Sequence, residues 1–308
     1  STKGWLPLED DVAADEPVAP PTQKAIFGYG TTGSVVSMSN LVNSSGVIAT
    51  DVTGVGSARE ALAAATYGLD KAIFGYGNTG SRVSLTNLVS NSGVVATDTT
   101  GVGTARDGLA AAAYGIDKAI FAYGQTADAK VSLSNLVSNS GVVAADVSGV
   151  GSARSSLAAA GYGTDKAIFG YGSTGSDVSL TNLVSNTGVV SADVSGVGTA
   201  RRILAATSYG TDKAIFGYGW DGSSYLSITN LVNSSGVVAA DVSGVGTIRR
   251  GLSAAGYGGD KAIFAYGNTG SASSLSNLVN SSGVVASDVS GVGTARFDLA
   301  AAGYSSSA

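Results

Sequence analysis

The strongest constraint on the fold of this chain is a motif that recurs six times at a nearly constant spacing. The motif is Lys-Ala-Ile-Phe-(Gly or Ala)-Tyr-Gly, and successive copies start 47 or 48 residues apart. The copies begin at Lys24, Lys71, Lys118, Lys166, Lys213 and Lys261. A period of this length is typical of propellers, solenoids and arrays. Six near-copies also offer six like sites, whereas catalysis needs unlike groups that converge on one point.

Each repeat divides at its glycines into four short segments, which in the second repeat are residues 71–76, 81–90, 93–99 and 106–114. The segments have β-forming patterns, and the connections consist largely of Gly, Asn, Ser and Thr, which form turns. The last segment contains Leu-Ala-Ala-Ala, which also has helix propensity. Its short length and the hairpin-like Tyr-Gly-x-Asp after it favour a strand. The sequence therefore predicts four strands per repeat, as in a propeller blade.

The two ends of the repeat region complement each other. The first repeat starts at Lys24 without the Arg-led segment that precedes every other motif, and a spare segment of this kind lies at residues 296–304. Pairing of this segment beside residues 24–29 would complete the first blade and remove free sheet edges. We therefore expect residues 24–308 to form an all-β, six-bladed propeller whose ring is closed by its C-terminal strand.

Residues 1–23 lack repeat character and form a predicted N-terminal arm. This segment holds all four prolines and five acidic residues, which predicts an extended chain. One interpretation is a disordered tail. The other is an anchor, because Trp5, Leu6 and Leu8 form an apolar cluster suited to a groove on a partner protein, a neighbouring subunit or the chain's own body.

The composition argues against several classes of function. The chain has no His and no Cys, so it lacks the commonest general acid–base, the commonest metal ligand and any thiol. A net charge of −5 disfavours nucleic-acid binding, and no apolar run approaches the length of a membrane span. Gly28, Gly30 and Gly33 fit a dinucleotide motif, but a strand-like segment follows where that site needs a helix. We expect no enzyme activity, no cofactor and no metal centre.

One Asp and one Arg recur in every repeat. They could form rings of charge that bind an ion or a charged ligand. Alternatively, the Asp caps a turn and the Arg ties strands or blades together, which we favour because every copy retains both residues. The aspartates are Asp51, Asp98, Asp146, Asp193, Asp241 and Asp288, and the arginines are Arg59, Arg106, Arg154, Arg201, Arg249 and Arg296.

The repeats differ most in the loop after Gly-Tyr-Gly. In a propeller these loops emerge on one face, and binding residues favour loops on a rigid scaffold, with aromatic residues as typical anchors. The alternative is neutral drift at a tolerant turn. The candidate ligand-binding residues are Trp220, Asp221 and Tyr225 in the fifth repeat, with Arg82, Lys130 and Asp177 in the corresponding loops of other repeats. A second variable position follows the recurrent Arg and holds Glu60, Asp107, Ser155, Arg202, Arg250 and Phe297.

The stretch Arg-x-x-Leu-Ala-Ala-Ala-x-Tyr-Gly-x-Asp-Lys-Ala-Ile-Phe-Gly-Tyr-Gly resembles a degenerate kelch repeat, in which an Arg-led strand turns into an apolar strand that ends in glycines. The resemblance covers residues 24–304, although Gly-Tyr-Gly replaces the usual Gly-Gly pair and the Trp of the outer strand is absent. The whole repeat is similar to kelch-like repeats encoded in bacteriophage genomes, among virion and tail-associated proteins.

This resemblance implies a non-enzymatic structural or appendage protein of a virion. Its expected location is the extracellular particle, with the arm bound to other virion proteins at the capsid, neck or tail. The alternative is a lectin-like or receptor-binding adhesin that contacts a host-surface glycan or receptor through the variable loops. Both functions are compatible with a homo-oligomer.

Overall fold

The computed structural model describes residues 22–308, which form an all-β architecture of six three-stranded antiparallel sheets. The strands are β1 (Lys24–Gly28), β2 (Ser39–Val42), β3 (Ala63–Tyr67), β4 (Lys71–Gly75), β5 (Thr86–Val89), β6 (Ala110–Tyr114), β7 (Lys118–Ala122), β8 (Ser134–Val137), β9 (Ala158–Tyr162), β10 (Lys166–Gly170), β11 (Thr181–Val184), β12 (Ala205–Tyr209), β13 (Lys213–Trp220), β14 (Tyr225–Val232), β15 (Ser253–Tyr257), β16 (Lys261–Ala265), β17 (Ser276–Val279) and β18 (Ala300–Tyr304). This part of the chain contains no helix, and so none that could span a membrane.

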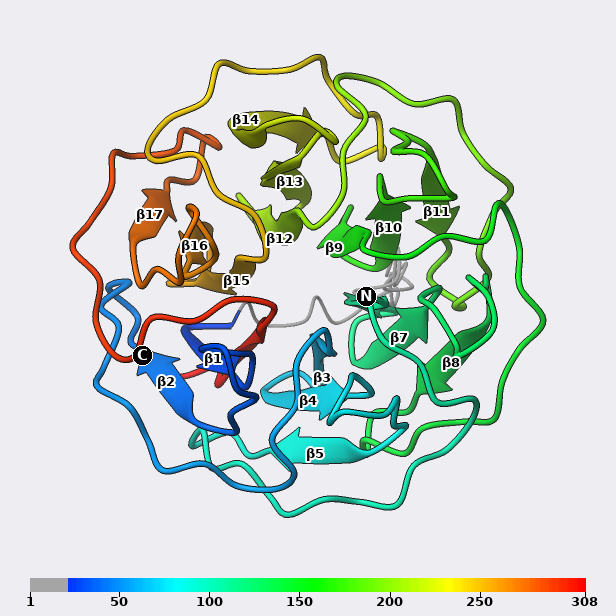
Figure 1. The fold of residues 1–308 in the computed structure, drawn as a ribbon, viewed down its shortest axis with the longest axis horizontal. Helices are drawn as coiled ribbons and strands as arrows, with labels where there is room; N and C mark the ends of the chain where they lie inside the picture. The colour runs from blue at the N-terminus through cyan, green and yellow to red at the C-terminus, as the bar shows by residue number, and fades with distance from the viewer. Residues whose placement is uncertain (1–21) are drawn as a thin grey trace, which may run out of the picture.

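The six sheets are arranged around a common axis, as in a β-propeller (Figure 1). Blade 1 is β18–β1–β2, blade 2 is β3–β4–β5, and blades 3 to 6 each take the next three strands. The first strand of each blade lies innermost and contacts that of the next blade, including β18 with β3. We call the end of the ring that carries the variable loops the loop face. The opposite end, where innermost and middle strands are joined by turns, is the hairpin face.

The C-terminal strand completes blade 1, which confirms the predicted pairing of the two ends of the repeat region. β18 pairs with β1 in antiparallel register from Lys24↔Tyr304 to Gly28↔Ala300. In the other blades the innermost strand is the segment just before the motif, so β18 supplies what the first repeat lacks. The Ala-rich segment is a strand in every blade, as predicted.

The prediction of four strands per blade is wrong, because the outermost segment meets the sheet only at isolated bridges. In blade 2 these bridges join Val89 to Val95 and Thr86 to Thr99. Three residue steps along β5 therefore face four steps along the outer segment. The extra residue interrupts the hydrogen-bond ladder, as in a β-bulge. Beyond it, the chain runs around the outside of the ring to the next blade (Figure 1).

The apolar core lies between neighbouring blades. Phe74 of blade 2 packs on Tyr29 of blade 1 with ring centres 5.2 Å apart, and a Cβ on Gly28 would lie 2.8 Å from the Phe74 ring. Blades 3 and 6 have Ala122 and Ala265 in place of this glycine. We call the interface between two neighbouring blades a seam. At the seams that follow blades 3 and 6 the Tyr and Phe ring centres are 5.5 Å apart, whereas at the other four seams they are 5.1–5.2 Å apart. The added methyl group is thus accommodated by a slightly larger separation of the two rings.

Two closed belts of backbone hydrogen bonds link all six blades. At the loop face the N–H of Ala61 donates to the carbonyl of Asp298 at 2.8 Å, and equivalent bonds continue around the ring. The members of this loop-face belt all have positive φ, and they are Ala61, Gly108, Ser156, Ile203, Gly251 and Asp298. At the hairpin face a turn residue of each blade donates to the residue before the motif lysine of the next blade. These donors are Gly68, Gly115, Gly163, Gly210, Gly258 and Ser305. The blades are therefore held together at both ends of the ring.

Candidate functional site

The loop face brings the two variable positions of the repeat together across the seams between blades. Between blades 2 and 3, Arg82 Nε donates to Asp107 Oδ1 at 3.0 Å. Between blades 4 and 5, Asp177 and Arg202 form a similar pair with the charges exchanged, and Arg202 Nη1 lies 2.7 Å from Asp177 Oδ1. Residues that vary separately along the sequence are therefore complementary partners in space.

Blade 5 carries an extended hairpin at this face. Its strands β13 and β14 have eight residues each, and Trp220 pairs directly with Tyr225. Asp221 closes the turn by accepting hydrogen bonds from the backbone N–H groups of Ser224 at 2.7 Å and Ser223 at 2.9 Å. These bonds hold the pKa of Asp221 below its usual value. The hairpin thus presents an aromatic pair in a defined position.

Two arginines pack against this aromatic pair. The guanidinium of Arg202 lies 4.4 Å from the centre of the Trp220 ring. That of Arg250 lies 5.1 Å from the Trp220 ring and 5.3 Å from the Tyr225 ring. We call Asp177, Arg202, Trp220, Tyr225 and Arg250 the aromatic–arginine cluster. All five are partly exposed, so the cluster can stack on a ligand and donate guanidinium hydrogen bonds to it.

The structure brings together four of the six candidate ligand-binding residues, namely Trp220, Asp221, Tyr225 and Asp177. Arg82 and Lys130 lie on other blades, where Lys130 Nζ donates to Ser173 Oγ at 3.1 Å. Arg202 and Arg250 belong to the cluster, although in the sequence they stand out only as occupants of a variable position. The available signal was the Arg-Arg doublet that stands on each side of the Trp220 loop in the sequence.

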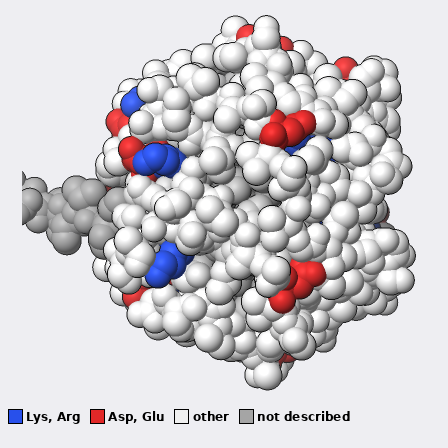
Figure 2. Space-filling view, turned by 90° about the vertical axis from the view of Figure 1, so that its left-hand side faces the viewer, with Lys and Arg blue, Asp and Glu red and all other residues white. Residues whose placement is uncertain are grey.

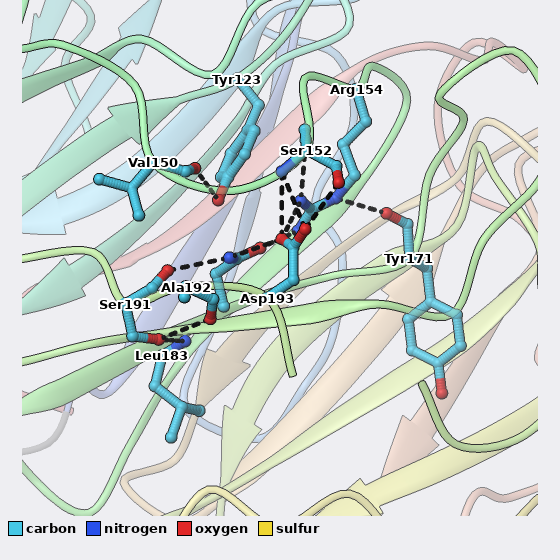
Figure 3. Close-up of polar contacts among 10 residues, drawn as sticks. Tyr123, Val150, Ser152, Arg154, Tyr171, Leu183, Ser191, Ala192 and Asp193 are labelled. Carbon is cyan, nitrogen blue, oxygen red and sulfur yellow. Dashed lines mark hydrogen bonds and ion pairs between the residues drawn. The ribbon is translucent and has the colours of Figure 1, made fainter. Parts of the chain in front are cut away.

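The recurrent Arg of each repeat is fully buried between two blades. Figure 3 shows Arg154, whose Nε donates to the carbonyl of Tyr171 at 2.9 Å and whose Nη1 donates to the carbonyl of Ser152 at 3.3 Å. Its Nη2 donates to Asn182 Oδ1 at 2.6 Å, and its guanidinium lies 4.2 Å from the centre of the Tyr123 ring. Burial lowers the pKa of Arg154, but each nitrogen has a hydrogen-bond acceptor.

The recurrent Asp holds the crossover, which is the segment that connects one blade to the next. Asp193 accepts hydrogen bonds from the Ser152 N–H at 3.0 Å, the Ser152 hydroxyl at 2.6 Å and Asn182 Nδ2 at 2.9 Å. Burial alone would raise the pKa of Asp193, but these bonds outweigh it and the pKa lies below its usual value. The Asn was not predicted as a member of this network, although it recurs in every repeat as the first residue of Asn-Leu-Val. Its copies are Asn40, Asn87, Asn135, Asn182, Asn230 and Asn277.

The closing seam departs from this pattern. Arg296 Nη2 and Asn40 Oδ1 are both buried, and neither has a hydrogen-bond partner among residues 22–308. At the five other seams the corresponding atoms lie 2.5–2.8 Å apart. The remaining bonds of Arg296 are present, including that from Nε to the carbonyl of Tyr29 at 2.9 Å. The seam that joins the two ends of the repeat region therefore makes one buried hydrogen bond fewer.

Charged side chains are sparse on the face of the molecule that Figure 2 shows. In the view of Figure 2, charged atoms form small separate patches of both signs on an otherwise uncharged surface. Within residues 22–308, no group of three or more carboxylates is placed to hold a metal ion. The predicted docking residues Trp5, Leu6 and Leu8 lie outside the described residues. Comparison with protein-family models and with curated protein sequences finds no match to this chain.

Proposed function

We propose that this chain is a non-enzymatic attachment protein. In this proposal a kelch-like, six-bladed propeller is displayed on a bacteriophage particle, is anchored by its N-terminal arm, and binds a host-surface glycan or receptor through its loop face. The observation that carries the proposal is the aromatic–arginine cluster, which gives one sector of a repetitive ring a distinct chemistry.

The rigidity of the scaffold supports a binding role. Two closed hydrogen-bond belts and six buried arginines hold the blades in position. Within the cluster, Arg202 is held by Asp177 and by the Trp220 ring, so these side chains are ordered before a ligand arrives. A preordered site loses less conformational entropy on binding, which leaves more of the contact energy as affinity.

The chemistry of the cluster favours a saccharide over an extended peptide. Aromatic rings stack on the apolar faces of sugar rings, and guanidinium groups donate paired hydrogen bonds to hydroxyl or carboxylate oxygens. Arg250 contacts both Trp220 and Tyr225, so one ligand group placed there can reach an aromatic face and a cation together.

Binding of the purified full chain to a glycan panel and to candidate host cells tests this proposal. We expect saturable binding that falls at least about tenfold when Trp220→Ala and Tyr225→Ala are combined, equivalent to about 1.4 kcal/mol. Arg82→Ala is the matched control, because this residue lies on the same face but outside the cluster. Binding that is unchanged in the double variant, or reduced equally in the control, would exclude the cluster as the site.

A purely structural role on the particle is the second candidate, and the closed belts favour it because they would equally suit a load-bearing ring. It predicts no binding to cells or glycans by the wild-type chain. It also predicts that removal of residues 1–23 prevents incorporation into particles, whereas the Trp220→Ala and Tyr225→Ala changes leave incorporation intact.

A further inference from the structure

The seam between blades 1 and 2 contains a groove that the loop-face site does not involve. The groove has a volume of about 360 Å³, near the lower end of the range of about 300–1,000 Å³ seen for ligand pockets. Leu41 and Val42 of β2 line it together with Lys24 at the start of β1, and Asn91 of blade 2 lines it as well. Val47 also lines it and is 60% exposed, and its counterparts in the other blades are 61–65% exposed.

The lysine distinguishes this seam from the others. In five blades the motif lysine pairs with the Asp just before it, with N–O distances of 2.7–3.7 Å. Gln23 takes the place of that Asp in blade 1, and Lys24 has no acidic partner among residues 22–308. The groove therefore combines an apolar lining with one ammonium group that lacks an acidic partner there.

We propose that this groove binds residues 5–11 of the same chain. Their sequence, Trp-Leu-Pro-Leu-Glu-Asp-Asp, places three large apolar side chains directly before three carboxylates. The apolar residues match Leu41, Val47 and Ala49, which are at least partly exposed, and the carboxylates match the ammonium of Lys24. A Trp ring removed from water contributes most of the expected affinity, and a partly exposed ion pair adds at most about 1 kcal/mol.

The connection between the two parts is long enough. The backbone at Thr22 is held at the hairpin face, where the N–H of Gly259 donates to its carbonyl at 3.1 Å, and Lys24 follows two residues later. The stretch from residue 11 to residue 22 can span about 36 Å when extended. Tethering through a linker of this kind gives an effective concentration in the millimolar range, which favours the chain's own arm over that of a second copy. The arm would then strap blade 1, the blade that closes the ring, to blade 2.

The absence of native cysteine makes the proposal directly testable by disulfide trapping in the full chain. We expect Leu8→Cys with Val47→Cys to form an intramolecular disulfide in most molecules, seen as a faster-migrating monomer on a non-reducing gel. Lys24→Glu should lower the yield at least about fivefold. Leu8→Cys with Val94→Cys is the matched control, because Val94 is the equivalent exposed residue of blade 2, whose lysine is already paired. Equal yields at the two positions, no disulfide at Val47, or disulfide-linked dimers would each overturn the proposal.

Tryptophan fluorescence provides a second measurement without cysteines. The chain has two Trp residues, so Trp220→Phe leaves Trp5 as the sole reporter. We expect blue-shifted emission from Trp5 that moves to longer wavelength in Lys24→Glu and stays in place in the control Lys71→Glu. Emission typical of solvent-exposed Trp before any change to Lys24 would contradict docking. Both tests are independent of ligand binding at the loop face, so their failure leaves that part of the proposed function untouched. Their success would leave only the other residues of the arm, 1–4 and 12–21, to anchor the chain to a particle.

Discussion

The guanidinium of Arg154 lies 4.2 Å from the centre of the Tyr123 ring in blade 3. Its Nε also donates to the carbonyl of Tyr171 in blade 4, so Arg154 contacts both blades. This contact makes the recurrent Arg a bridge between blades. We expect Arg154→Ala to lower the free energy of unfolding by about 3–5 kcal/mol, because it leaves the carbonyl of Tyr171 and Asn182 Oδ1 buried without a donor. Urea unfolding measures the change. Arg296→Ala should cost less, since Arg296 makes one hydrogen bond fewer, and equal costs would contradict this account.

The recurrent aspartates should make the protein sensitive to acid. Hydrogen bonds hold the pKa of Asp193 below its value of 3.8 in an unperturbed side chain, so protonation favours the unfolded state. The stability from this group is present above about pH 4 and is lost as the pH falls through the lowered pKa. Asp193→Asn should therefore cost about 1–2 kcal/mol at pH 7 and less at pH 3. Urea midpoints at the two pH values test this, and a cost independent of pH would contradict it.

Asp298 should show the opposite pH dependence. Burial, with a contribution from the nearby charge of Glu60, raises the pKa of Asp298 to about 6. The folded state thus favours the neutral form, and its contribution to stability is lost as the pH rises from about 4 through 6. Asp298→Asn should stabilise the protein on the order of 1 kcal/mol at pH 8 and little at pH 4. Asn also tolerates the positive φ of 52° at this position. Thermal unfolding across this range is the measurement, and destabilisation at pH 8 would refute the prediction.

The glycine beside the inter-blade aromatic pair should tolerate a methyl group at a modest cost. A Cβ on Gly75 would lie 2.7 Å from the Phe121 ring, yet Ala122 occupies the equivalent position in blade 3. We expect Gly75→Ala to cost roughly 1 kcal/mol and to move the Tyr76 and Phe121 ring centres from 5.2 Å to near 5.5 Å. A crystal structure and thermal unfolding of the variant check both values. Loss of folding would show that the seams are not equivalent.

The charge pair between blades 2 and 3 should be reversible, because Asp177 and Arg202 already form a similar pair in the opposite sense. Arg82→Asp alone should destabilise by about 1 kcal/mol through repulsion from Asp107. Adding Asp107→Arg should restore most of the loss, as measured by a double-mutant cycle. Additive losses would mean that the two side chains do not interact in solution.

The predicted fourth strand of each blade, which the structure lacks, shows where local sequence patterns no longer predict the fold. The segment that contains Val95 and Thr99 has β-forming residues, so the sequence predicted a strand. Whether it completes a ladder depends on its register against Thr86 and Val89, and one extra residue breaks that register. Propensity is a property of a segment, whereas pairing is a property of two segments and their relative length.

The candidate site shows the same limit. The sequence identified Trp220 and Tyr225 as distinctive, but their relation to Arg202 and Arg250 depends on how the crossovers reach the loop face. Asp177 lies 25 positions from Arg202 in the chain and 2.7 Å from it in space. No local pattern encodes this proximity, because it depends on the placement of one blade against the next.

By itself the sequence determined the all-β class, the sixfold repetition and the pairing of the first repeat with the C-terminal segment. It could do so because the same turns and apolar patterns recur six times, and because the missing segment at one end matches the spare segment at the other. The tertiary structure alone decided which polar groups meet across the seams. Asp51 accepts the hydroxyl hydrogen of Thr294, which is 243 positions away, only because the closed ring brings the two ends of the repeat region together.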